Sequence, residues 1–189
     1  LNTVADITSD SVTVTINSTT VTETTSDGKW TSAINGRKFR RSGRNEYYEI
    51  SGYSNANPDT FTLDRVFEGA TATSAAYAIF QDIYTIPAAA RVVLSIRRVN
   101  SPAFLTRVTA DELQSAFPHR PTIGDPEYWA IYGRDSSNVQ RVQLYPAPTD
   151  AEGLIVHYIE ETPVLDDGAD SVLDQVPFSL LRAGMKANL

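Results

Sequence analysis

The chain has 189 residues, of which 41% are hydrophobic and 21% are charged, a balance that excludes a disordered chain and supports a buried core in one domain or two small ones. It contains no cysteine, which excludes disulfide bonds and zinc sites built from thiolates. The net charge is -7, and residues 151–189 alone carry 2 basic and 7 acidic side chains, which disfavours a protein that grips nucleic acid over a broad basic face.

Both ends of the sequence suggest a piece of a longer protein. It starts at Leu1 without a methionine, and it stops within FSLLRAGMKANL, which is typical of a helix that continues. No apolar run approaches the ~18 residues of a membrane helix, so no membrane association is predicted.

The first part of the chain has the pattern of an all-β module. Residues 11–22 alternate β-branched and small polar residues, which is typical of a strand. Asn35-Gly36 suits a tight turn, and NEYYEISGYS, TFTLDRVFEG and AAYAIFQDIYTIP are further strands, the last of them ending at Pro87. We therefore predict a small β-barrel or sandwich over residues 11–87.

Residues 88–189 are predicted to form an antiparallel β region with two helices. ARVVLSIRRV, EYWAIYG and VQRVQLYP are typical of strands. Thr109 and Glu112 fit the capping-box pattern, which predicts a short helix near 109–117, and Pro177 suits the first turn of a C-terminal helix. The predicted fold class is mainly β, of the α+β kind.

The stretch RVQLYPAPTDAEGLIVHYIEETPVL, residues 141–165, is predicted to be a hairpin with stiff corners. Pro146 and Pro148 each fix a backbone angle and remove a donor, and Pro163 ends the second strand. Such corners fix where the chain turns, which suits a scaffold whose position carries its function.

A basic stretch around Phe39 is the strongest charge feature. It consists of Arg37, Lys38, Arg40, Arg41 and Arg44. It could hold a nucleic-acid backbone or pair with an acidic neighbouring subunit. It could also be a hairpin with solvated arms and Phe39 pointing inward, or a basic edge that blocks strand pairing.

No catalytic, cofactor or metal site is predicted. His119 and His157 are the only histidines, and neither accompanies a nucleophile elbow or a second metal ligand at useful spacing. DDGADSVLD lacks the ligand spacing of an EF-hand, so a solvated acidic turn is favoured over a weak calcium loop. Trp30 and Trp129 could stack on sugars, but packing in a core is the favoured interpretation.

The loop at residues 118–126 is predicted to be an exposed contact loop. Pro118, Pro121 and Pro126 restrict it, and His119 and Arg120 lie near its tip. Deleting residues 119–124 is expected to leave the monomer folded and to block assembly.

Residues 24–87 resemble a small β-barrel module that recurs in virion proteins of tailed bacteriophages. The resemblance rests on the Trp30 strand and on GRKF, YYEI, FTLDRVFEG and AAYAIFQDIY. The rest resembles the head–tail connector (adaptor, or tail-tubular-protein-A-like) group in the order of ARVVLSIRRV, TADELQSAFPHRPTIGDPEYW, VQLYPAPTD and PVLDDGADSVLDQVPFSLLRAGMKANL. Members of that group usually also carry N-terminal helices, which this sequence lacks.

The resemblance implies a non-enzymatic structural protein of the virion neck, assembled in the bacterial host cytoplasm. Such an adaptor forms a ring, expected here to be a dodecamer, beneath the portal protein, and joins the capsid to the tail or tail tube. The ring lines the channel for double-stranded DNA without binding a particular sequence, and the acidic C-terminal segment suits a wall that does not grip DNA. Alternatives are a tail-fibre, baseplate or decoration protein and, less favoured, a carbohydrate-binding module or a hydrolase.

In a head-to-tail ring, the basic stretch of one subunit could approach the acidic segment of the next. The acidic side chains concerned are Asp166, Asp167, Asp170 and Asp174. Exposed ion pairs are each worth only about 0–1 kcal/mol, so these contacts would tune register and not hold the ring together.

Overall fold

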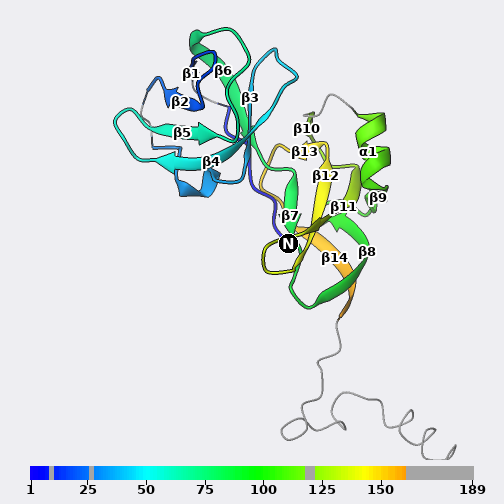
Figure 1. The fold of residues 1–189 in the computed structure, drawn as a ribbon. Helices are drawn as coiled ribbons and strands as arrows, with labels where there is room; N and C mark the ends of the chain where they lie inside the picture. The colour runs from blue at the N-terminus through cyan, green and yellow to red at the C-terminus, as the bar shows by residue number, and fades with distance from the viewer. Residues whose placement is uncertain (9–10, 26–27, 118–121, 161–189) are drawn as a thin grey trace, which may run out of the picture. The chain divides into compact units, whose positions relative to one another are not determined.

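Six antiparallel strands close into a barrel in the computed structural model, which describes residues 1–8, 11–25, 28–117 and 122–160 (Figure 1). The order around the barrel is β1-β2-β5-β4-β3-β6, and β1 closes it by pairing with both β2 and β6. The strands are β1 Ser11–Val14, β2 Thr20–Glu23, β3 Lys38–Arg41, β4 Tyr48–Ser54, β5 Thr60–Leu63 and β6 Ala72–Phe80. The prediction of a mainly β chain with a small barrel is confirmed.

The prediction of one strand over residues 11–22 is wrong, because this segment is a hairpin. β1 and β2 pair through Val12 with Glu23 and Val14 with Val21, on either side of a turn in which Asn17 has a φ of 62°. Asparagine tolerates this left-handed conformation better than most residues. The Thr-rich alternation continues through the turn and hides it.

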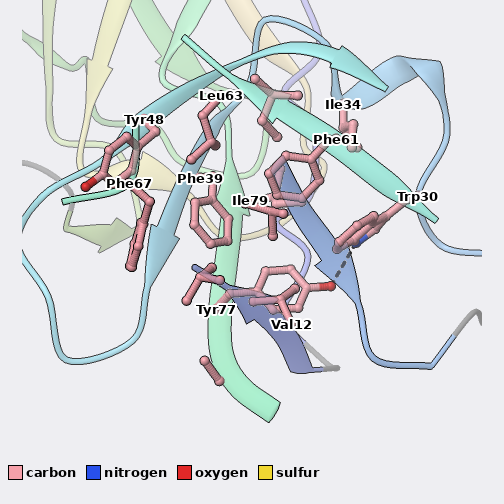
Figure 2. Packing of buried hydrophobic residues seen from close by; sticks show 14 residues of the cluster. Val12, Trp30, Ile34, Phe39, Tyr48, Phe61, Leu63, Phe67, Tyr77 and Ile79 are labelled. Atoms are coloured by element: carbon pink, nitrogen blue, oxygen red, sulfur yellow. Dashed lines mark hydrogen bonds between the residues drawn. The ribbon is translucent and has the colours of Figure 1, made fainter. Parts of the chain in front are cut away.

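Large aromatic side chains fill the barrel (Figure 2). Trp30 Nε1 donates a hydrogen bond of 2.9 Å to the Tyr77 hydroxyl, and the Trp30 ring lies 4.7 Å from that of Phe61. Phe39 is fully buried among them, as one of the interpretations of the basic stretch required. Because successive strand residues point to opposite faces, the neighbours of Phe39 on β3 point out of the barrel.

A second β region follows the barrel. Its four-stranded sheet has the order β7-β12-β11-β9, with β7 Ile83–Thr85, β9 Thr106–Arg107, β11 Tyr128–Arg134 and β12 Gln140–Tyr145. Two smaller sheets pair β8 Ala90–Arg98 with β14 Leu154–Glu160, and β10 Ile123–Gly124 with β13 Ala147–Pro148. A core that includes Trp129, Val142 and Ile96 lies within this region.

Three predictions about the second region need correction. The region is not purely antiparallel, because β9 with β11 and β10 with β13 are parallel pairs. β7 pairs with β12 and not with a barrel strand, so the barrel strands end at Phe80 and not at Pro87. β12 and β14 do not form a hairpin with each other, because they belong to different sheets.

The predicted short helix is confirmed as α1, Ala110–Ala116. Thr109 and Glu112 form the expected capping box, in which each side chain accepts a hydrogen bond from the backbone N–H of the other residue. At the end of the helix, Phe117 stacks on Tyr145 of β12 with 4.0 Å between the ring centroids. The predicted C-terminal helix lies outside the described residues.

The N-terminal residues run along the second region before they enter the barrel. Asn2 forms a bridge with Gly153, Thr3 N–H donates to the Glu152 carbonyl, and Asp6 N–H donates to the Thr149 carbonyl. Ile7 then pairs with Ile79 of β6. Residues 1–159 accordingly form one compact unit.

Candidate functional site: the contact surfaces of the chain

Two of the five cations in the basic stretch are buried inside the chain. Arg37 and Lys38 are both less than a tenth exposed. Arg37 Nη2 donates to the carbonyl oxygens of Ala5, at 2.6 Å, and Ile79, at 3.0 Å. Lys38 Nζ lies 2.7 Å from Asp82 Oδ2. Arg37 and Lys38 are therefore not available to a neighbouring subunit or to DNA, which corrects their place in the predicted interface.

Lys38 belongs to a buried polar cluster that joins the barrel to the second region. Asp82 lies between β6 and β7, and its Oδ2 accepts hydrogen bonds of 2.7 Å from Lys38 of β3 and from Gln143 Nε2 of β12. Ala78 and Phe80 lie on the outward face of β6. They pack against Ala147 of the second region. A buried ion pair is a weak source of stability but is costly to break on one side, so it favours an arrangement of the two regions that keeps both partners in contact.

Burial also shifts the pKa values of the groups around Arg37. Desolvation lowers the pKa of Arg37. The electrostatic interactions with the nearby Tyr84 and Asp6 oppose this shift. Desolvation raises the pKa of Tyr84 to about 12 and also raises the pKa of Asp6. The Tyr84 hydroxyl donates to the Gln81 carbonyl at 2.9 Å. These groups serve packing between the two regions.

The other cations of the basic stretch are nearer to solvent. Arg40 and Arg41 are half-buried, and Arg41 Nη1 donates to the Ala70 carbonyl at 3.0 Å. Desolvation lowers the pKa of Arg40. Arg44 is exposed beyond the end of β3. These three side chains keep their predicted role as candidates for a contact, whereas the acidic residues predicted to face them, 166–174, lie outside the described residues.

The predicted contact loop is only partly described, because His119 and Arg120 lie outside the described residues. Its second half is not a free loop. Ile123–Gly124 form β10, and the Thr122 carbonyl accepts a 2.9 Å hydrogen bond from Ala147 N–H. Deleting residues 119–124 would remove this strand, so the expectation that the monomer stays folded is withdrawn.

A polar pocket of about 370 Å³ lies between the barrel and the second sheet. Its lining includes Lys38, Glu49, Arg65, Tyr132 and Arg141. The Arg141 guanidinium lies 5.5 Å from the Tyr132 ring centroid, and Arg65 pairs with Asp64 at 3.1 Å. The lining contains both acidic and basic side chains, so it does not present a single charge to a ligand.

The described residues contain no group of three or more histidine, aspartate or glutamate side chains placed to hold a metal ion. His157 is exposed on β14, and its ring meets that of Phe104 edge-on at 6.1 Å. Trp30 and Trp129 are buried, as predicted, so neither offers a face to a sugar. In the described part of the chain, no helix is long and apolar enough to cross a membrane.

Exposed apolar side chains gather on and beside the sheet formed by β8 and β14. We call this surface the β8–β14 face, and its members are Val92, Leu94, Val99, Phe104 and Ile159. They are five of the nine large hydrophobic residues that the described structure leaves exposed. Phe104 is 58% exposed and reaches this sheet through its bridge with Arg97 of β8. Sequence reasoning missed this face, although the apolar residues at odd and even positions of ARVVLSIRRV were a signal for it.

The fold places the chain in a structural class. It is a mainly β protein in which a closed six-stranded barrel is joined to a second β region. No family model, no curated protein and no solved structure matches the chain.

Proposed function

We propose that this chain is a non-enzymatic structural protein of a tailed-phage virion. It is a head–tail adaptor that forms a ring, a dodecamer, beneath the portal protein and joins the capsid to the tail. Its partners are other copies of itself, the portal protein and the tail or tail-tube protein. Double-stranded DNA passes through the ring without sequence-specific contacts. The phage assignment rests on the resemblance of residues 24–189 to virion modules.

The β8–β14 face is the observation that best supports a role in assembly. Exposed apolar side chains that gather in one part of a protein surface often mark a site that binds another surface. Here more than half of the exposed large hydrophobic residues of the described chain lie on one small sheet and the segment next to it. A binding surface of this kind fits a subunit of an assembly better than a free monomer.

The buried cluster around Asp82 supports the same proposal. A subunit of a large assembly must hold its parts, here the barrel and the second region, in one fixed arrangement. Lys38 and Gln143 both bind Asp82, and Arg37 spans from Ile79 to Ala5, so four separate segments of the chain are fixed to one another.

Native mass measurement of the full-length protein, alone and with its portal protein, tests the proposal. We expect a ring that binds the portal at one face. A protein that stays strictly monomeric with and without the portal at micromolar concentration would reject the adaptor function. Trimers that ignore the portal would favour a tail-fibre, baseplate or decoration protein.

A further inference from the structure

Within the described residues, the sheet formed by β8 and β14 has an open edge on each side. On the β8 side, the described neighbours are Phe104, which bridges Arg97, and Leu105, whose N–H donates to the Ile96 carbonyl. Residues 91–95 have no second strand beside them in the described part of the chain. Unpaired backbone donors and acceptors at such an edge can accept a strand from another chain.

On the opposite side, the described N-terminal residues cover the beginning of β14. Leu154 N–H donates to the Leu1 carbonyl at 2.6 Å, and Asn2 bridges Gly153. Among the described residues, no second strand lies beside residues 155–160. The two open edges are different strands, and each carries exposed apolar side chains: Val92 and Leu94 on β8, and Ile159 on β14.

The two strands also carry opposite charges. β8 contains Arg91, Arg97 and Arg98 and no acidic residue, whereas β14 contains Glu160 and neither lysine nor arginine. Arg98 is engaged by Glu152 at 2.7 Å and by Asp125 at 2.9 Å. Arg91 and Glu160 are exposed and form no ion pair with another described residue. A β8 edge is therefore complementary in charge to a β14 edge and not to another β8 edge.

We propose that the open edge of β8 in one copy pairs with the open edge of β14 in the next copy, so that the two-stranded sheets of neighbouring copies join into one. The occupant of the β8–β14 face is thus a second copy of this chain. Because the two edges differ, the contact is head to tail, and repeats of such a contact build a ring when their rotations close. This inference rests on the proposed function and names the surface that builds the ring.

The pairing accounts for the exposed side chains as well as for the backbone. Strands that join a sheet lie about 4.8 Å apart, close enough for side chains on the same face to touch. Val92 and Leu94 of one copy would lie beside Ile159 of the next, and Arg91 would lie near the neighbour's Glu160. Apolar area that is open to water in the single chain would be buried in the ring.

Disulfide trapping tests the contact directly, because the chain has no cysteine of its own. Single variants Val92→Cys and Leu94→Cys are each mixed with His157→Cys or Ile159→Cys, one of the two chains in each mixture carrying a tag that gives the mixed dimer its own mass. All four sites are in strands, and the four mixtures cover different registers of the strand pair. The matched control is Ile16→Cys, on the barrel, where Ile16 is 48% exposed compared with 55% for Leu94.

We expect at least one mixture to give mixed dimers at a rate tenfold or more above every mixture that contains the Ile16→Cys control. Rates equal to the control in all four mixtures would overturn the inference. So would faster trapping of Leu94→Cys with itself than with the β14 variants, because that outcome indicates a twofold contact. Slow maleimide labelling of Leu94→Cys in dilute monomer would also overturn it, since another part of the same chain would then cover the face.

The inference and the proposed function can fail separately. Rings that form on the portal without any trapping between β8 and β14 would reject the edge pairing and leave the adaptor function standing. Trapped β8–β14 contacts in a protein that ignores the portal would support the edge pairing and reject the adaptor function.

Discussion

Single side chains at the junction determine how firmly the barrel is held to the second region. Lys38 and Asp82 are each about one tenth exposed and lie 2.7 Å apart. Replacing Lys38 by methionine leaves the Asp82 carboxylate buried with Gln143 as its remaining partner. Removing one member of a buried pair costs about 3–5 kcal/mol because the other charge stays desolvated.

We expect Lys38→Met to lower the free energy of unfolding by about 3 kcal/mol, as measured by urea denaturation. The double variant Lys38→Met/Asp82→Asn should recover most of this loss, because no unpaired charge remains. Arg65→Met, which breaks the exposed pair with Asp64, is the control and should cost about 0–1 kcal/mol. A double variant no more stable than Lys38→Met would contradict the account.

Tyr84 gives the junction a response to alkaline pH. Its pKa is raised from 10.0 to about 12, mainly by desolvation, so the folded protein favours the neutral phenol. The stability that this group contributes is therefore complete below pH 10 and is lost as the pH rises toward 12.

We expect Tyr84→Phe to cost about 1 kcal/mol at pH 8, since the hydrogen bond to Gln81 is lost. Phenylalanine does not titrate, so the difference between the variant and the wild type should shrink between pH 10 and 12. Urea unfolding at pH 8 and pH 11 measures both values. A difference that stays constant over this range would refute the assigned pKa shift.

At the level of elements, the capping box allows the stability of α1 to be changed by a substitution outside the barrel. The helix has 7 residues, and only Leu113 among them is buried. We expect Thr109→Ala to remove about 1 kcal/mol of helix stability, because the N–H of Glu112 loses its acceptor. Hydrogen exchange of the α1 amides measures the effect, and Ser115→Ala, at an exposed site, is the control.

The same capping box should respond to acid. Hydrogen bonds from the backbone and side chain of Thr109 lower the pKa of Glu112 from its ordinary value of 4.5. A depressed carboxyl pKa contributes stability that is present above this ordinary value and is lost as the pH falls through the lowered one. Protection of the α1 amides should therefore decrease below pH 4.5 in the wild type and change less with pH in Glu112→Gln. Equal pH dependence in the two proteins would count against the capping role.

Sequence reasoning found the elements that local chemistry specifies. Thr109 and Glu112 are three residues apart and fix the start of α1, and the alternation around Phe39 places this side chain in a core. Sequence reasoning failed where the β-branched or apolar pattern of one strand continues past the end of that strand into the next. Thr15 and Thr19 prolong the β-branched pattern on both sides of Asn17, and the apolar run of β6 resumes in β7 after Asp82.

The partners of the strands could not be predicted, because pairing depends on contacts between residues far apart in the sequence. The charge of Lys38 suggested an exposed side chain, yet Asp82 and Gln143 make its burial possible, and no local pattern links the three. The β8–β14 face was missed for a related reason. Apolar residues such as Val92 and Leu94 suggest a buried strand until the structure shows that nothing described covers them.

At the scale of the whole molecule, the β8–β14 face should control assembly. Leu94→Glu places a carboxylate on the proposed contact, whereas Ile16→Glu places one at a similarly exposed site on the barrel. We expect Leu94→Glu to raise the protein concentration needed for half-maximal assembly at least tenfold, as measured by sedimentation. We expect Ile16→Glu to leave this concentration unchanged. Equal effects of both substitutions would show that the face has no special part in assembly.

The chain enters the barrel at Ile7 and leaves it at Phe80, the last residue of β6. Ile7 and Ile79 are hydrogen-bonded to each other, with N–H to carbonyl distances of 2.9 Å in both directions. A segment whose entry and exit lie side by side can be inserted into a host protein, or removed from it, with little change to the host's path. The barrel can therefore be regarded as an insertion into the second region. One recombination event could exchange residues 8–79 for another barrel. The new barrel would need residues in the places of Arg37 and Lys38 to renew the hydrogen bonds to Ala5 and Asp82, and one in the place of Ala78 to pack against Ala147. Evolution could thus change the barrel surface while the strands proposed to build the ring, β8 and β14, remain unchanged.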